Sequence, residues 1–161
     1  MEILFEQTWI LFIVATLING FLFKVRSKTY IAEKPELEKG YGDIFMGYII
    51  LGCIPWIIVG IGNLTGITQS ITDYFFPRQM NPMVLAFHGT LVLIWLLSIW
   101  WVYFRGGAEF IERHPGLFVQ RGLGNRQDLT AIQVKRFLPL MLLGGVIAMV
   151  MMWTFDSPVP A

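Results

Sequence analysis

The chain has 161 residues, of which 55% are hydrophobic and 14% are charged, and its mean hydropathy is +0.62. Soluble domains have about 45–50% apolar and about 25% charged residues, so this composition excludes an ordinary cytosolic globule as well as a disordered chain. The formal net charge of +1 is not the basic footprint of a nucleic-acid-binding protein. A single cysteine excludes a disulfide framework and a cysteine-rich metal site.

Four long uncharged stretches cover most of the sequence, at 7–23, 44–72, 79–104 and 137–155. About 20 apolar residues are enough for an α-helix to cross about 30 Å of hydrocarbon. Runs this continuous lack the alternation of a membrane β-strand. We therefore predict an all-α, polytopic membrane protein with one transmembrane domain over residues 1–161. Its four helices form a bundle and cover approximately 3–25, 43–64, 81–104 and 128–155.

Polar residues at the edges of these stretches predict the helix ends. Asn81-Pro82 predicts the start of the third helix, because Asn is a favoured N-cap and Pro is tolerated at the first helical position. By the same argument we expect Asp43, after a turn at 40–42, to cap the second helix and Asp128 to cap the fourth. The glycines and polar residues after Leu64 predict the end of the second helix and a following loop or interfacial segment.

The distribution of positive charge predicts the orientation. Five Lys and Arg residues lie in 24–42 and six lie in 105–136, whereas Arg78 is the basic residue on the opposite side. Because Lys and Arg accumulate in cytoplasmic loops, we expect loops 24–42 and 105–136 in the cytoplasm and both termini outside. The expected location is an inner (plasma) membrane or an equivalent energy-converting membrane, with the lipid bilayer as a partner and no nucleic acid.

Small residues mark the helix faces expected inside the bundle or in a homo-oligomer, because helices in lipid associate through close backbone approach. These faces comprise Gly144 and Ala148 on the fourth helix, Gly52, Trp56 and Gly60 on the second, and Ala15, Thr16, Asn19 and Gly20 on the first.

His88 is the titratable residue deepest in a predicted helix, roughly 10 Å below its outer end at 1.5 Å per residue. Ionisable groups inside a membrane are costly and indicate function, although a neutral imidazole bonded to a neighbouring helix is the structural alternative. Depth counting predicts a polar outer-leaflet site formed by His88 and four further residues, Glu6, Gln7, Asn63 and Arg78.

A haem or a quinone is the cofactor expected at His88. A bis-histidine haem needs two intramembrane histidines, and because His114 lies in the second basic loop, such a site within one chain is not expected. A single-histidine haem, a haem shared between two chains, and a quinone head group bonded to His88 stay open. In its helix count the chain resembles the small four-helix anchor subunits of quinone-linked respiratory complexes, a resemblance that implies a quinone-linked membrane.

The expected function is a non-enzymatic integral membrane subunit. It would pack with other chains, as a homo-oligomer or with other membrane subunits, and bind a quinone or haem near His88. One alternative is a homo-oligomeric ion channel or proton-coupled small-solute carrier that uses the level of Glu6 and His88. Another is a structural assembly factor without a ligand. The sequence contains no G-x-S-x-G, H-E-x-x-H or C-x-x-C motif, so no catalytic residue and no metal ligand is predicted.

Overall fold

Four long helices make up most of the computed structural model, which describes residues 7–117, 119–121 and 126–154. They are α2 (Thr8–Glu33), α3 (Glu38–Leu64), α4 (Pro82–Phe104) and α6 (Ala131–Thr154). Each is long and apolar enough to cross a membrane, since 23 to 27 residues extend over about 35–40 Å. The predicted four helices that could span a membrane are confirmed; a short pair of strands is an addition that the sequence did not predict.

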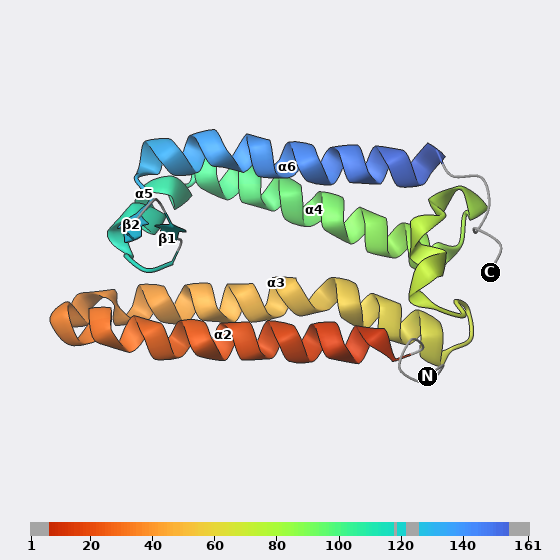
Figure 1. The fold of residues 1–161 in the computed structure, drawn as a ribbon, viewed down its shortest axis with the longest axis horizontal. Coiled ribbons are helices and arrows are strands. Elements are labelled where there is room, and N and C mark those ends of the chain that lie inside the picture. The colour runs from red at the N-terminus through yellow and green to blue at the C-terminus, as the bar shows by residue number, and fades with distance from the viewer. Residues whose placement is uncertain (1–6, 118, 122–125, 155–161) are drawn as a thin grey trace.

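Short elements connect the long helices into two pairs. Figure 1 shows α2 beside α3 and α4 beside α6. The two pairs meet at one end, called here the η2–η3 end, and α5 lies at the other, called the α5 end. The short elements are η1 (Pro35–Leu37), η2 (Ile71–Phe75), η3 (Pro77–Gln79), α5 (Gly107–Arg113), and the antiparallel strands β1 (Val119–Arg121) and β2 (Arg126–Asp128), in which Val119 pairs with Asp128.

Small residues bring α2 and α3 together, as the sequence predicts for this pair. A Cβ added to any of three glycines would collide with a side chain of α2 or α3: Gly20 meets Ile49, Gly52 meets Thr16 and Gly60 meets Trp9. Beside them, the rings of Phe12 and Trp56 stack with centroids 3.9 Å apart. The absence of a side chain at these positions therefore lets the two backbones approach closely.

On α6 the predicted small residues do not pack inside the described chain, so of the two alternatives for this face only the homo-oligomer stays a prediction. Gly144 and Ala148 are exposed, and a Cβ at Gly144 would meet nothing within 4 Å. Gly145 instead packs against the Trp95 ring of α4. Successive helical residues point about 100° apart, so contact through Gly145 turns Gly144 away from α4. On α2, likewise, Ala15 and Asn19 are exposed.

Helix α2 is longer than predicted: it ends at Glu33, whereas the sequence predicted an end near residue 25. Residues 26–33 are mostly polar, but they continue the helix beyond the apolar run. Proline disfavours helical geometry at the preceding residue, and Lys34 has φ −139° and ψ 82°. Helix α3 then begins at Glu38. Asp43 is therefore exposed inside a helix, and the predicted turn at 40–42 with an Asp43 cap is wrong.

Two of the other predicted helix ends are confirmed and one is corrected. The Asn81 side chain accepts a hydrogen bond from Met83 N at 3.0 Å, and α3 ends at Leu64. Helix α6 begins at Ala131 rather than 128, because Thr130 and Gln133 cap each other's backbone amides at 2.9 and 3.3 Å, a reciprocal capping box. Asp128 instead accepts from Gly116 N at 2.7 Å. Predicted residues 3–6 and 155 lie outside the described ranges.

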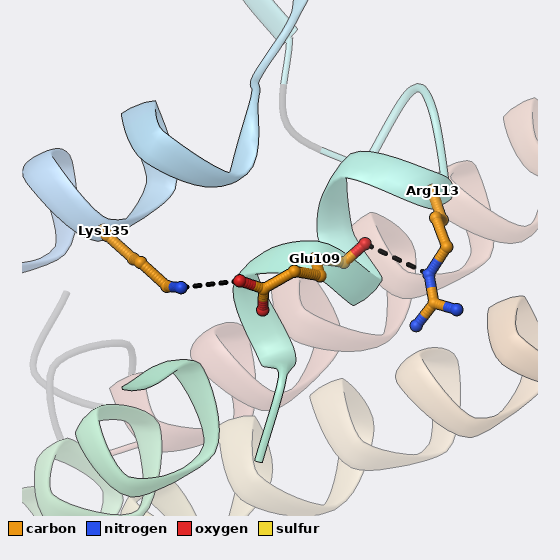
Figure 2. Close-up of polar contacts among 3 residues, drawn as sticks. All are labelled: Glu109, Arg113 and Lys135. Carbon is orange, nitrogen blue, oxygen red and sulfur yellow. Dashed lines mark hydrogen bonds and ion pairs between the residues drawn. The ribbon is translucent and has the colours of Figure 1, made fainter. Parts of the chain in front are cut away.

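Helix α5 is attached to α6 by apolar packing and one ion pair. Val102, Ala108, Ile111 and Val134 form a buried cluster. Beside it, the Lys135 ammonium lies 2.6 Å from a Glu109 carboxylate oxygen, and Arg113 Nε donates to the Glu109 carbonyl oxygen at 3.3 Å (Figure 2). The hydrogen bond from Lys135 holds the pKa of the Glu109 carboxyl below its usual value.

Gly60→Ala is expected to destabilise the α2–α3 pair by about 1–3 kcal/mol, the usual cost of overpacking, because its Cβ would lie 2.7 Å from the rigid Trp9 indole. Gly47→Ala is the matched control in the same helix. Its Cβ meets nothing within 4 Å, so it is expected to be neutral or stabilising. Denaturant unfolding of the detergent-solubilised protein measures both, and equal stabilities would contradict the packing.

Acid is expected to remove the contribution of the Glu109–Lys135 pair. Because folding lowers the Glu109 pKa from 4.5, its stabilisation is complete above that pH and is lost as pH falls through the folded-state value. Glu109→Gln has no carboxylate at this position, so the melting-temperature difference between wild type and variant should shrink below pH 4.5. A difference that does not change with pH would contradict the assignment. The pair is solvent-exposed, so the effect is small.

Candidate functional site

Helix η2 positions the polar groups at the η2–η3 end. Its start is capped by Ser70, whose hydroxyl accepts from Thr72 N at 3.2 Å, and by Asp73, whose carboxylate accepts from Gln69 N at 2.7 Å. This turn carries Tyr74 into the interior, where it is 3% exposed and packs against Val59 and Val84. The Tyr74 backbone carbonyl then lies against α4.

His88 is buried in α4 and bonded to that carbonyl. It is 4% exposed, and its Nε2 lies 2.9 Å from Tyr74 O. A carbonyl oxygen only accepts, so Nε2 carries the hydrogen and donates. In the neutral imidazole Nδ1 is then a bare acceptor, and it has no hydrogen-bond partner among the residues described. The rings of Phe87 and Trp153 lie edge-on to the imidazole, with centroids at 5.7 and 6.3 Å.

A chain of buried polar groups extends from Tyr74 towards α3. Thr68 is 2% exposed. Its hydroxyl donates to Asn63 Oδ1 at 2.8 Å and lies 3.4 Å from the Tyr74 hydroxyl. Burial raises the pKa of the Tyr74 hydroxyl, so it is a protonated donor at neutral pH. Gly62 leaves room for this contact, because a Cβ there would collide with both hydroxyls.

Two of the five predicted site residues are joined by this arrangement. Both contact the Tyr74–Thr68 pair: His88 bonds the Tyr74 main-chain oxygen, and Asn63 bonds the Thr68 hydroxyl, which lies 3.4 Å from the Tyr74 hydroxyl. Gln7 is half-buried at the start of α2, at the same end of the molecule. Arg78 lies exposed in η3, also at this end. Glu6 falls outside the described residues.

Sequence reasoning missed Tyr74 and Thr68, the two residues that connect the others. Both belong to the segment predicted as a loop or interfacial stretch. The signal that could have identified its order is the spacing of Ser70 and Asp73, which matches a capping box and predicts a helical turn at 71–75. Trp9 was also missed; its indole Nε1 is buried without a hydrogen-bond partner in the described part of the chain.

The geometry does not fit a bis-histidine haem held within this chain. Nε2 of His88 donates to the Tyr74 carbonyl, which leaves Nδ1 as the bare nitrogen of this imidazole. His114 follows α5 and its Nδ1 bonds Phe110 O at 2.7 Å. The part of α4 that follows His88 is by itself about 24 Å long. The imidazoles of His88 and His114 therefore lie far from one another. Among the described residues no group of three His, Cys, Asp or Glu could hold a metal ion. The bare Nδ1 suits a ligand that offers a hydroxyl hydrogen.

Comparison with known proteins gives no further guide to the site. No family model, curated protein or solved structure matches the chain.

His88→Leu is expected to lower the free energy of unfolding by about 1–3 kcal/mol, because it leaves the buried Tyr74 carbonyl without a donor. His88→Gln supplies a donor and should recover most of that loss. Ser98→Ala is the control on the same helix, since its hydroxyl bonds the Ile94 carbonyl of that helix, and should change stability by less than about 0.5 kcal/mol. Denaturant titrations in detergent measure all three; a His88→Leu protein as stable as wild type would show that the bond is not formed.

Proposed function

We propose that this protein is a non-enzymatic integral membrane subunit that packs with other chains and binds the head group of a lipid-soluble quinol at His88. The observation that supports the proposal is the buried imidazole with one nitrogen held by Tyr74 O and the other without a partner in the described residues. A buried acceptor of this kind is costly, and an ionisable residue inside a membrane is a functional-site hypothesis by default.

The chemistry of the imidazole favours the reduced form of the ligand. A quinol hydroxyl donates a hydrogen bond, whereas a quinone carbonyl only accepts one and has no donor at Nδ1. Phe87 and Trp153, whose rings lie edge-on to the imidazole, are aromatic neighbours that a flat quinol ring would contact. Trp153 is 38% exposed, so we place the entry of a lipid-soluble ring on this side.

The helix surfaces support a role as a subunit. Many large apolar side chains on all four long helices are exposed, as expected in lipid or against other membrane helices. The small face of Gly144 and Ala148 on α6 is not used by the described part of the chain. Both basic loops lie at the α5 end (Figure 1), so we propose that this end faces the cytoplasm and the His88 end faces outward.

The two alternative functions, a channel or carrier and an assembly factor, differ from the proposal in the residues or the ligand that they require. A channel or proton-coupled carrier at this level uses Glu6, and no contact in the described residues favours that function. An assembly factor without a ligand has the same helices but carries no quinol. Ligand content therefore separates the proposal from its nearest alternative.

The test is native mass spectrometry of the protein in mild detergent, with quantification of isoprenoid quinols and quinones extracted from the same sample. Wild type should retain the ligand and show no Soret band. His88→Gln should retain at least tenfold less, because it keeps a donor to Tyr74 O but loses the acceptor at Nδ1. Ser98→Ala is the matched control and should retain as much as wild type.

Two results would contradict the proposal. The first is a wild-type protein that carries no quinol or quinone when purified from quinone-containing membranes. The second is a His88→Gln protein that keeps the wild-type amount while its melting temperature is unchanged.

A further inference from the structure

Asn19 places an amide on an exposed part of α2 at membrane depth. It lies about 16 Å along the helix from Thr8 and about 7 Å before Lys24, the first charged residue after it. The Lys24 ammonium lies 5.3 Å from the Phe45 ring centroid. Within the described part of the chain, no hydrogen bond joins the Asn19 side chain to another residue.

Three hydroxyl side chains of the spans do not share this problem. Thr16, Thr90 and Ser98 each donate at 2.8 Å to the carbonyl four residues earlier in their own helix. The Asn19 amide makes no such bond, so its two hydrogens and its oxygen face a solvent that offers neither donors nor acceptors. An unsatisfied polar group in hydrocarbon is costly, and the amides of Asn and Gln are groups that join membrane helices.

A second polar group lies at the same depth. Gly20 of α2 meets Ile49 of α3, and Asn19 and Tyr48 each precede one member of this pair. Because α2 and α3 run antiparallel, residues one position before a facing pair lie on the same side of both helices. Tyr48 is 44% exposed, and its hydroxyl has no hydrogen-bond partner among the residues described.

Ala15, one turn before Asn19, is also exposed and presents only a methyl group. A small residue one turn from a polar one allows another helix to approach closely enough for its polar group to reach the amide. The three residues Ala15, Asn19 and Tyr48 are called here the Asn19 face.

We infer that the Asn19 face is a self-association surface on which a second copy of this chain docks. An amide carries both donors and an acceptor, so it is complementary to an identical amide across a two-fold axis, where the same patch meets itself. Lipid chains supply no such partner. The inference rests on the part of the proposed function that has the subunit pack with other chains, and it is independent of the ligand at His88.

Cysteine cross-linking in native membranes tests the surface directly. In a Cys53→Ala background, which removes the one natural thiol, Ala15→Cys should form a disulfide-linked dimer under mild oxidation. Val14→Cys is the matched control, since it is 44% exposed but points about 100° away around α2, and should form little. Equal cross-linking at the two positions, or none at residue 15, would overturn the inference.

Copy number tests the amide itself. Native mass spectrometry should show a wild-type dimer, at least tenfold weaker association for Asn19→Leu, and recovery with Asn19→Gln. Thr16→Val removes a hydroxyl that is bonded within its own helix and should leave the dimer unchanged. A wild-type monomer, an Asn19→Leu dimer of wild-type strength, or a complex containing one copy with a different protein would each overturn it.

Quinol content measured on the same samples separates this inference from the proposed function. Asn19→Leu should lose the dimer and keep the quinol, and His88→Gln should lose the quinol and keep the dimer. A failure at one position therefore does not carry over to the other.

Discussion

Four helices that are long and apolar enough to cross a membrane set the constraint on which the rest of this structure depends. Hydrocarbon offers no hydrogen bonds to a backbone, so an amide or carbonyl within it must be paired in its own helix or with a neighbouring polar group. The same requirement applies to side chains: Thr16, Thr90 and Ser98 bond a carbonyl of their own helix. Glycines let the backbones of α2 and α3 approach closely. The polar groups in the described residues that have no partner are therefore the candidates for binding a ligand or another chain.

Hydropathy and proline together explain why helix existence was predictable and helix length was not. The apolar stretches indicate where the chain could cross lipid, and they identified four helices. They do not indicate where a helix stops once it leaves lipid, because polar residues such as those at 26–33 form helix as readily in water or among head groups. Pro35 was the better signal for the end of α2, and the pairing of Thr130 with Gln133 was the better signal for the start of α6.

The candidate site was predictable in part for a similar reason. His88 stands out because a titratable residue in an apolar stretch is rare. Tyr74 does not stand out, because it acts through a backbone carbonyl that every residue type possesses, and its position depends on a turn capped by Ser70 and Asp73. The sequence therefore could not predict which nitrogen of the imidazole is free, because that depends on where the Tyr74 carbonyl lies in three dimensions.

The use of a main-chain oxygen to hold His88 has a consequence for how this protein can change over evolutionary time. Replacing Tyr74 by another residue alters the packing around the ring but leaves the carbonyl in place. The imidazole therefore keeps the same tautomer through substitutions at position 74 that preserve the turn. Insertion or deletion of a residue between Ser70 and Tyr74 would instead move the carbonyl away from Nε2 and remove the contact that fixes the tautomer.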